Sequence, residues 1–440
     1  MLRRFDIAER GSTPAAEVRG AVATFLTMSY ILFANPSILA TAGVPFAPAV
    51  AATAAAAAIC SILMGVVANF PIALASGMGL NAVIAYQVAP AAGSWQVAMG
   101  IVVLDGIVAF ALVVLGLREA VMTAIPRDLR RAISVGIGLF IAFIGLVNAK
   151  LVIVPAGTLA ALAKNPLVVM PPVVHGSLRT PEALVALIGL LITSVLIARR
   201  VSGAIVIGIV ASTALALVIG VAALPTTSWV SLPSFATVGQ ADVMGAIRSS
   251  ALPMLLPVLL VDFFDTIGTA TAVADAAGLA ERRGGIPGIR NVLAVDSLSA
   301  AVGGFFGASS VTSYIESAAG VAEGARTGLH SVVVGLLFGT ALFLTPVFSI
   351  VPAAATAPAL IAVGFLMCEQ ITRIDFQDLE IALPAFVLMV TVPFTYSISH
   401  GIGYGFITFV VIKVFSAKWQ SVHPLMYATA TGFAAYFIFG

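Results

Sequence analysis

The chain has 440 residues, of which 60% are apolar and 9% charged, and its formal net charge is +2. Its mean hydropathy is +1.12. Soluble domains carry about 25% charged residues, and a core of ordinary size cannot hide so much apolar surface, so the composition excludes a soluble globular protein and indicates a chain embedded in lipid, without a nucleic-acid-binding surface.

Apolar segments long enough to cross a bilayer as helices repeat along the chain, since a crossing takes about 20 residues. We expect about fourteen by this length criterion. They lie near 20–43, 49–70, 71–89, 94–117, 130–149, 181–199, 203–222, 250–274, 289–308, 309–325, 328–350, 352–371, 379–398 and 401–417. In the first segment Asn35-Pro36 predicts a kink or helix end. Residues 423–440 are either a further membrane segment or an interfacial helix.

The basic residues indicate the orientation, because short loops rich in Lys and Arg stay in the cytoplasm. They follow the even-numbered spans: Arg118, Arg127, Arg130, Arg131, Arg199, Arg200, Arg282, Arg283, Arg290, Arg326, Arg373 and Lys418. The longest loops, 150–180 and 223–249, fall on the other side. We therefore expect a multi-pass protein of the cell membrane whose residues 1–19 form a cytoplasmic tail.

Two of the expected spans do not have the composition of plain membrane helices. Residues 73–82 contain Gly77, Gly79 and the polar Asn81, and residues 309–320 are rich in hydroxyl groups and contain Glu316. Such segments suit broken helices that line a cavity inside the protein. They are the third and tenth spans, which are matching positions in two halves of seven. Because seven is odd, the halves would run in opposite senses, as an inverted repeat.

Residues 260–271 (LVDFFDTIGTAT) hold the densest group of polar side chains inside a span. A carboxylate there costs about 2.5 to 3.5 kcal/mol on insertion scales and asks for an explanation. In a helix Asp262 and Asp265 lie on one side, with Thr269 one turn beyond Asp265. Asp265 is therefore a candidate site residue. The alternative is a structural pair satisfied by neighbouring donors, which applies with more force to Asp262.

Glu316 lies two residues after Tyr314 in the other broken segment. If that stretch is extended, both side chains point the same way. A carboxylate accepts N–H donors and an aromatic ring offers a stacking face, which are the two demands of a flat nitrogenous ring. Simple packing is the alternative for Tyr314. We favour structural roles for the remaining acidic residues inside or beside spans, Asp105, Asp275, Asp296 and Glu323.

Enzymatic chemistry has little support in the sequence. The four histidines, His175, His330, His400 and His423, have no Cys or His partner at metal-ligand spacing. A phosphate-cradling Gly-x-x-x-x-Gly-Lys motif is also absent, which argues against ATP-driven transport by this chain alone. We expect a transporter that is not an enzyme and needs no cofactor or metal.

Three motifs together resemble the AzgA-type adenine/guanine/hypoxanthine permeases of the nucleobase–ascorbate transporter (NCS2) group. They are residues 76–81 (SGMGLN), 261–268 (VDFFDTIG) and 310–317 (SVTSYIES). The likeness extends over essentially the whole chain. In the uracil and xanthine relatives a glutamate precedes a His-Ile-Gly sequence, and Asp265 with Thr266 takes that place here. The Tyr-x-Glu of those relatives falls on Tyr314 and Glu316.

The resemblance implies a seven-plus-seven inverted repeat divided into two domains. The core domain would comprise 20–117 and 250–350, and the gate domain 118–222 and 351–440. Short strands would precede half-helices in spans three and ten, with the substrate between the half-helix ends. The resemblance further implies proton symport and frequently a homodimer.

We therefore expect import of purine nucleobases by alternating access. Asp265 or Glu316 would carry the proton, because a carboxylate sheltered from water takes up a proton more readily, and the other would hold ring N–H groups. Backbone N–H groups near Gly79 and Ser317 would complete recognition. Phe263, Phe264 and Leu80 are candidate apolar walls.

Other readings stay open. A uracil or xanthine permease, or an anion transporter, would keep the fold, although two carboxylates disfavour an anion. A channel or a membrane enzyme would need a charged ring or a nucleophile–base pair, and neither stands out.

Overall fold

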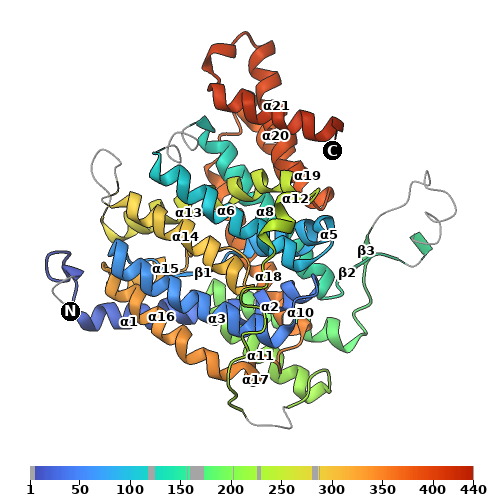
Figure 1. Cartoon of the computed structure of the whole chain (residues 1–440). Coiled ribbons are helices and arrows are strands. Elements are labelled where there is room, and N and C mark those ends of the chain that lie inside the picture. The colour runs from blue at the N-terminus through green and yellow to red at the C-terminus, as the bar shows by residue number, and fades with distance from the viewer. Residues whose placement is uncertain are drawn as a thin grey trace.

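The computed structural model describes residues 5–116, 124–155, 157–158, 173–201, 203–224, 229–279, 286 and 288–439, and nearly all of its elements are helices (Figure 1). The first half contains α1 (Pro14–Met28), α2 (Ile31–Ala40), α3 (Phe46–Leu63), the π-helix η2 (Met64–Ala68), β1 (Leu74–Ser76), α4 (Met78–Val83), the π-helix η3 (Ile84–Val88), α5 (Ala89–Ala92), α6 (Trp95–Val114), α8 (Arg127–Asn148), β2 (Val152–Ile153), β3 (Val174–His175), α10 (Pro181–Ala198) and α11 (Ala204–Ile219).

The second half follows the same plan. It contains α12 (Val243–Arg248), η4 (Leu252–Met254), α13 (Leu255–Ala277), α14 (Ile289–Phe306), β4 (Val311–Ser313), α15 (Ser317–Ala322), α16 (Gly328–Ala341), η5 (Leu342–Leu344), α17 (Thr345–Phe348), α18 (Ala353–Cys368), η6 (Glu369–Arg373), α19 (Leu379–Phe394), α20 (Ile398–Phe415), η7 (Trp419–Ser421) and α21 (Pro424–Phe439).

The helices confirm a multi-pass membrane protein. Within the described residues, 10 helices are long and apolar enough to cross a membrane, and two further apolar helices, α11 and α19, are shorter. The two segments expected to be broken do contain a strand and a short helix each, β1 with α4 and β4 with α15. In the predicted segment 423–440, Pro424–Phe439 form a helix, α21, which lies with α20 at one end of the molecule (Figure 1).

Contacts between helices come in matching pairs, as an inverted repeat requires. The second span, α3, packs on the eleventh, α16, and correspondingly the ninth, α14, packs on the fourth, α6. Likewise α10 packs on α11 as α19 packs on α20, and α8 packs on α19 as α18 packs on α10. In addition, α8 packs on α18 and β1 pairs with β4, so these equivalent elements of the two halves contact each other directly. The architecture is a seven-plus-seven inverted repeat.

Small residues let helices from the two halves approach closely, as is usual in lipid, where close packing replaces the hydrophobic effect between helices. A Cβ on Gly138 of α8 would lie 2.7 Å from the carbonyl oxygen of Gly364 in α18. A Cβ on Gly364 would lie 2.7 Å from the Cβ atom of Ala142. Glycine is required at both positions, because any side chain would push α8 and α18 apart.

The first span differs from the prediction in two ways. Its helix begins at Pro14, inside the expected tail, because the Thr13 side chain accepts a hydrogen bond from the N–H of Ala16 and proline suits a first turn. The break lies at Ser29–Tyr30, between α1 and α2, and not at Asn35-Pro36, which α2 includes. A proline disrupts the turn that precedes it, so the interruption falls upstream of Pro36.

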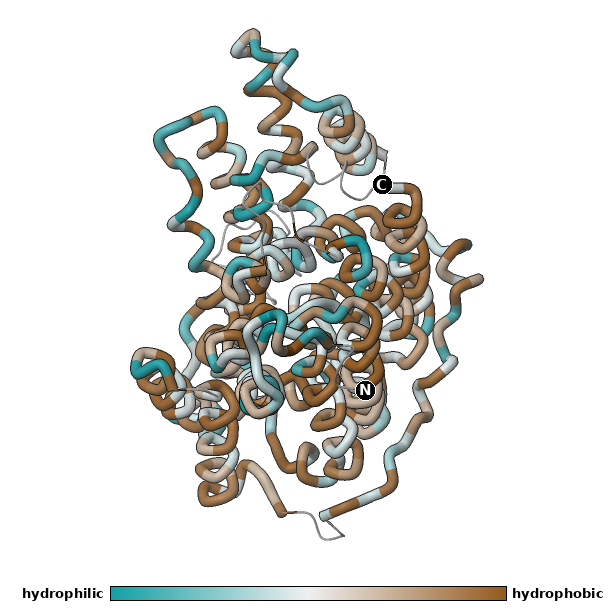
Figure 2. Tube along the Cα trace, turned by 90° about the vertical axis from the view of Figure 1, so that its left-hand side faces the viewer, coloured by the Kyte–Doolittle hydropathy of each residue, from teal (hydrophilic) through white to brown (hydrophobic). Residues whose placement is uncertain are grey.

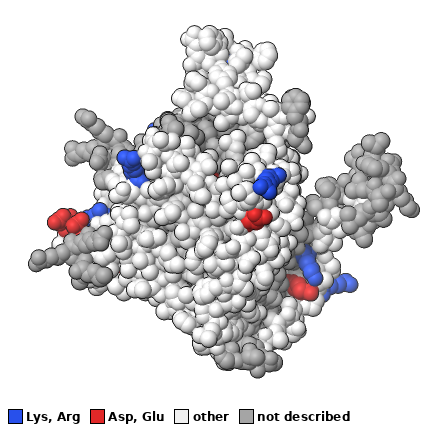
Figure 3. Space-filling view, viewed as in Figure 1, with Lys and Arg blue, Asp and Glu red and all other residues white. Residues whose placement is uncertain are grey.

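Charged side chains cover little of the face seen in Figure 3, and apolar residues predominate along the trace in Figure 2. Large hydrophobic side chains point outward from many helices, including Val218, Phe394 and Phe415, which are at least 83% exposed. Water would not tolerate such a surface, but lipid does. Of the predicted basic loop residues, Arg118, Arg282 and Arg283 lie outside the described residues.

Candidate functional site

The two broken spans meet at their strands. β1 pairs antiparallel with β4, with Ala75 opposite Thr312. The N–H of Gly77 donates to the Ser310 carbonyl oxygen at 2.9 Å, and that of Tyr314 donates to the Ala73 carbonyl oxygen at 3.0 Å. This two-stranded ribbon satisfies the backbone groups that a broken membrane helix leaves free. It also brings the first residues of α4 and α15 together in the interior.

Glu316 lies at the first turn of α15, as its N-terminal flanking residue. Its side chain is partly accessible, whereas the residues before it, Ser313 and Tyr314, are buried. The Tyr30 hydroxyl donates a hydrogen bond to Glu316 Oε1 at 2.8 Å. Tyr30 comes from the break between α1 and α2, so a third interrupted element reaches the same carboxylate.

Asp265 lies in the middle of α13 and is also partly accessible. Its Oδ2 lies 3.8 Å from the position that a Cβ on Gly77 would occupy, directly before α4. The charges of Asp296 and Glu316 both act on its carboxyl group. The structure therefore brings Asp265 and Glu316 close enough for their charges to interact, in a group of acidic residues.

The other residues singled out in the two broken spans occupy distinct positions. Tyr314 is 5% exposed, and its hydroxyl donates to the Ser76 carbonyl oxygen at 2.5 Å. The Ser317 hydroxyl accepts from the N–H of Ala73 at 3.0 Å. These contacts tie the ribbon to the residues around it. Whether either side chain also touches a ligand stays a prediction.

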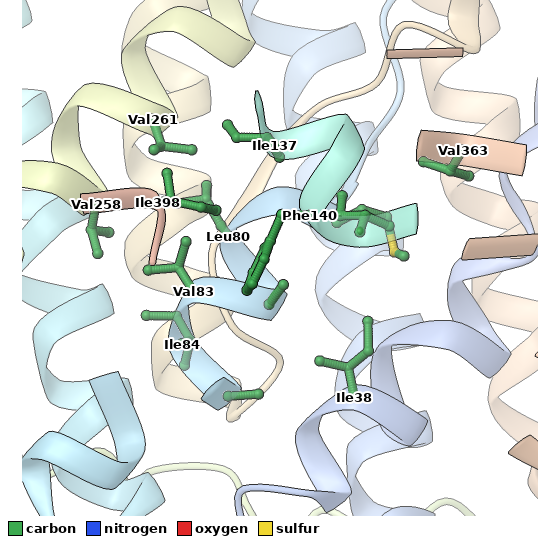
Figure 4. Packing of buried hydrophobic residues seen from close by; sticks show 14 of the residues in the cluster. Ile38, Leu80, Val83, Ile84, Ile137, Phe140, Val258, Val261, Val363 and Ile398 are labelled. Carbon is green, nitrogen blue, oxygen red and sulfur yellow. The ribbon is translucent and has the colours of Figure 1, made fainter. Parts of the chain in front are cut away.

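Gly79 and Leu80 lie at the start of α4 against α8. A Cβ on Gly79 would lie 2.8 Å from Cγ2 of Ile137. Leu80 is 1% exposed and packs in the apolar cluster with Ile137, Phe140 and Ile398 (Figure 4). Phe263 is fully buried in a separate cluster with α6 residues, away from these positions. The side chain of Phe264 lies outside the described part of the structure.

Asp296 contributes more to the candidate site than the sequence indicated, because its carboxylate accepts hydrogen bonds from strand β4. It is fully buried on α14. Its carboxylate accepts hydrogen bonds from the Thr266 hydroxyl at 2.5 Å, the Ser313 N–H at 3.0 Å and the Ser313 hydroxyl at 2.9 Å. Thr266 follows Asp265 and Ser313 belongs to β4, so Asp296 links the two elements that carry Asp265 and Glu316. A buried charge within a span was the available signal.

Replacing Asp296 with Asn is expected to lower transport about ten-fold or more. The amide keeps the volume but turns one acceptor oxygen into a donor, which leaves buried donors unsatisfied at a cost of about 1–3 kcal/mol. Uptake per molecule at the membrane measures the effect. Asp378→Asn is the matched control, because Asp378 accepts a backbone N–H from Glu380 at an exposed helix start, where Asn serves equally well. Equal uptake by the two variants would contradict the assignment.

The remaining acidic candidates contact other parts of the protein. Asp262 is fully buried beside the ribbon, and its Oδ1 accepts from the Ser310 hydroxyl at 3.4 Å. Glu323 forms an exposed ion pair with Arg19 at 2.9 Å. Asp275 is exposed on α13. In the described residues no group of three or more His, Cys, Asp or Glu side chains is placed to hold a metal ion.

Known proteins similar to this chain are permeases. Residues 15–404 match the family described as "Permease family" (Xan_ur_permease). Adenine permease AdeP of Escherichia coli is 39% identical over 100% of this chain and 96% of the relative. Guanine/hypoxanthine permease PbuG of Bacillus subtilis is 39% identical over 99% of both chains. A putative permease of Methanocaldococcus jannaschii, MJ0326, is 41% identical over 99% of this chain and 97% of the relative.

Solved structures share the fold at much lower identity. The transmembrane domain of the cyanobacterial bicarbonate transporter BicA superimposes with a TM-score of 0.64 at 15% identity, over 89% of this chain and 97% of that one. Murine Slc26a9, an anion transporter, gives a TM-score of 0.62 at 13% identity, over 92% of this chain and 69% of that one. These likenesses establish the architecture and carry no information on the cargo.

Proposed function

The chain belongs to the Permease family (Xan_ur_permease), and on that premise we propose that it is a secondary transporter that imports purine bases, namely adenine, guanine and hypoxanthine. Its relatives named as adenine or guanine/hypoxanthine permeases match essentially end to end. It is a transporter and not an enzyme. The proposal includes the cell membrane as its location with a cytoplasmic N-terminus, the proton as the coupling ion, and a homodimer as its assembled form.

The convergence of Asp265 and Glu316 carries this proposal. Both are partly accessible, and the groups whose charges act on Asp265 are the carboxylates Asp296 and Glu316. A site surrounded by negative charge repels an anion but suits a neutral ring that offers N–H donors. The observation therefore favours a nucleobase over bicarbonate or another anion, although the fold is shared with anion transporters.

In the proposed complex the purine lies between the first turns of α4 and α15. One of Asp265 and Glu316 accepts ring N–H groups and the other binds the coupled proton, so that a base and a proton enter together. Tyr314 borders the ring from β4, and backbone groups near Gly79 and Ser317 complete the contacts. Leu80 supplies apolar surface, since pockets for flat ligands are mostly apolar with a few polar groups.

The domain division is part of the same proposal. The core domain carries both acidic residues, and the gate domain packs on it through α8, α18 and α20. Leu80 and Val83 of α4 and Val258 and Val261 of α13 lie among Ile137, Phe140, Val363 and Ile398 of the gate domain (Figure 4). An apolar surface without strong directional bonds permits one body to slide against the other, as alternating access requires.

Contacts between the two bodies suggest which side is closed. Beyond the site, the Tyr86 ring packs edge-on against Tyr396 with centroids 5.8 Å apart, and the Ser397 hydroxyl donates to Gln87 Oε1 at 3.3 Å. These contacts join the end of the third span to the start of the fourteenth. With the N-terminus in the cytoplasm, this end faces outward.

The opposite half of α13 exposes polar surface. Gly268, Thr271 and Asp275 are exposed along one face of this half of α13. Threonine and aspartate suit water better than lipid. We therefore propose that the structure represents a state whose site opens toward the cytoplasm, with the outer end closed.

The test of function is uptake of labelled bases into proteoliposomes or into cells lacking their own purine permeases. Labelled hypoxanthine or adenine should accumulate with saturation, and unlabelled purines should compete. Labelled uracil, xanthine and bicarbonate test the alternative cargoes. Saturable uptake of one of these, with no uptake of adenine, guanine or hypoxanthine, would replace the proposed cargo, while conductance without saturation would indicate a channel.

A further inference from the structure

Tyr30 has an environment that the transport scheme above does not use. Its side chain is 1% exposed, in the joint between α1 and α2. Its hydroxyl donates to Glu316 Oε1 at 2.8 Å across 286 residues of sequence. The electrostatic interactions of this hydroxyl are with Glu316, Tyr314 and Asp265, which are the candidate site residues themselves.

The joint that carries Tyr30 is fixed on both sides. Phe25 of α1 packs edge-on against Phe338 of α16, with ring centroids 5.1 Å apart. Phe33 of α2 packs in the same way against Phe348 of α17, at 4.9 Å. Each such pair adds about 0.5–1.5 kcal/mol, so the helices on both sides of Tyr30 are anchored to their neighbours.

Glu316 is therefore held asymmetrically. The carboxylate has two oxygens, and the buried phenol donates to Oε1, while the Glu316 side chain as a whole stays partly accessible. We propose that Tyr30 is a positioning and specificity-determining residue, which orients Glu316 and leaves Oε2 as its stronger acceptor for ring donors. The inference rests on the proposed function, because it concerns how the same site ranks purines.

The bases differ in the donors that they offer to a carboxylate. Guanine presents a ring N–H next to an exocyclic amino group, which matches both oxygens of a free carboxylate side by side. Hypoxanthine has the ring N–H on that edge without the amino group. Oε1 keeps a second lone pair, but it already shares its charge with the Tyr30 hydroxyl and is the weaker acceptor, so the native site gains less from the second donor of guanine.

Tyr30→Phe is the discriminating change, because it removes one oxygen atom and keeps the buried ring. Hypoxanthine binding to the purified protein should weaken about ten-fold, the loss expected for one hydrogen bond to a charged group. Guanine should lose much less, since Oε1 without the Tyr30 hydroxyl becomes a stronger acceptor for its second donor. The ratio of guanine to hypoxanthine affinity should therefore rise about ten-fold relative to the native protein.

A control variant and a measurement of thermal unfolding accompany the test. Tyr404→Phe removes a hydroxyl from a partly exposed ring on α20 and should leave both affinities unchanged. Thermal unfolding of Tyr30→Phe shows whether the protein remains folded. An equal loss for both bases, or an unchanged or lowered ratio, would overturn the inference and leave Tyr30 a structural residue. Failure of the native protein to bind any purine would instead overturn the proposed function.

Discussion

Glu316→Gln and Asp265→Asn are each expected to reduce purine uptake at least about 100-fold. Each substitution keeps the shape of the side chain but removes a negative charge and turns an acceptor into a donor. At the residue that binds the ring, a ring N–H then meets another N–H, and at the other residue no group takes up the coupled proton. Losing a charged hydrogen bond and leaving buried partners unsatisfied costs about 3 kcal/mol or more, and each 1.4 kcal/mol is ten-fold. Initial uptake rates, normalised to the amount of protein in the membrane, measure the effect.

The chain offers a matched control for each change. Glu323→Gln alters an exposed carboxylate near the other end of α15, and Asp275→Asn alters an exposed one on α13. Both controls should transport at the native rate. Native uptake by Glu316→Gln and Asp265→Asn would remove the site assignment, whereas equal losses in the controls would mean that the charge of the whole region matters more than the two residues.

A proton gradient is expected to drive accumulation of the base. With one proton per base, a difference of one pH unit, acid outside, supports about ten-fold accumulation, because the gradient is worth about 1.4 kcal/mol. Proteoliposomes with an imposed gradient should concentrate labelled hypoxanthine, and a protonophore should collapse the accumulation. Exchange of sodium for potassium should have no effect. Accumulation that persists under the protonophore would indicate a different coupling ion, and equilibration without accumulation would indicate facilitated diffusion.

Exchange experiments separate the roles of the two carboxylates. Exchange of labelled for unlabelled base across the membrane needs binding and movement of the domains but no net proton flux. The residue that carries the proton should yield an amide variant that still exchanges base and no longer accumulates it. The residue that binds the ring should lose both activities. Loss of both in both variants would mean that one acidic group cannot be assigned to each role.

Much of the architecture follows from composition along the chain. Apolar runs of sufficient length predict the spans, and glycine and hydroxyl residues within two of them predict the breaks at β1 and β4. Such predictions succeed because lipid imposes the same requirement on every span, that backbone groups be paired and side chains be apolar. The predicted position of the break in the first span was wrong, because Pro36 lies inside α2 and acts on a turn upstream.

Asp265 and Glu316 were predictable as candidates because a carboxylate inside a span is costly wherever it lies. Their partners were not predictable in this way. Tyr30 looks like any aromatic residue in an apolar segment, and Asp296 was assigned a structural role near a loop. In the structure Tyr30 donates a hydrogen bond to Glu316, and Asp296 accepts a hydrogen bond from the Ser313 N–H.

The amino-acid sequence by itself determined that this protein lives in lipid, crosses it many times, and breaks two spans at matching positions, because each of these depends on the local balance of apolar and polar residues. Only the tertiary structure decided which polar groups face one another. The inverted repeat brings residues as distant as Tyr30 and Glu316 within 2.8 Å, and no local pattern records a contact made by folding one half of the chain against the other.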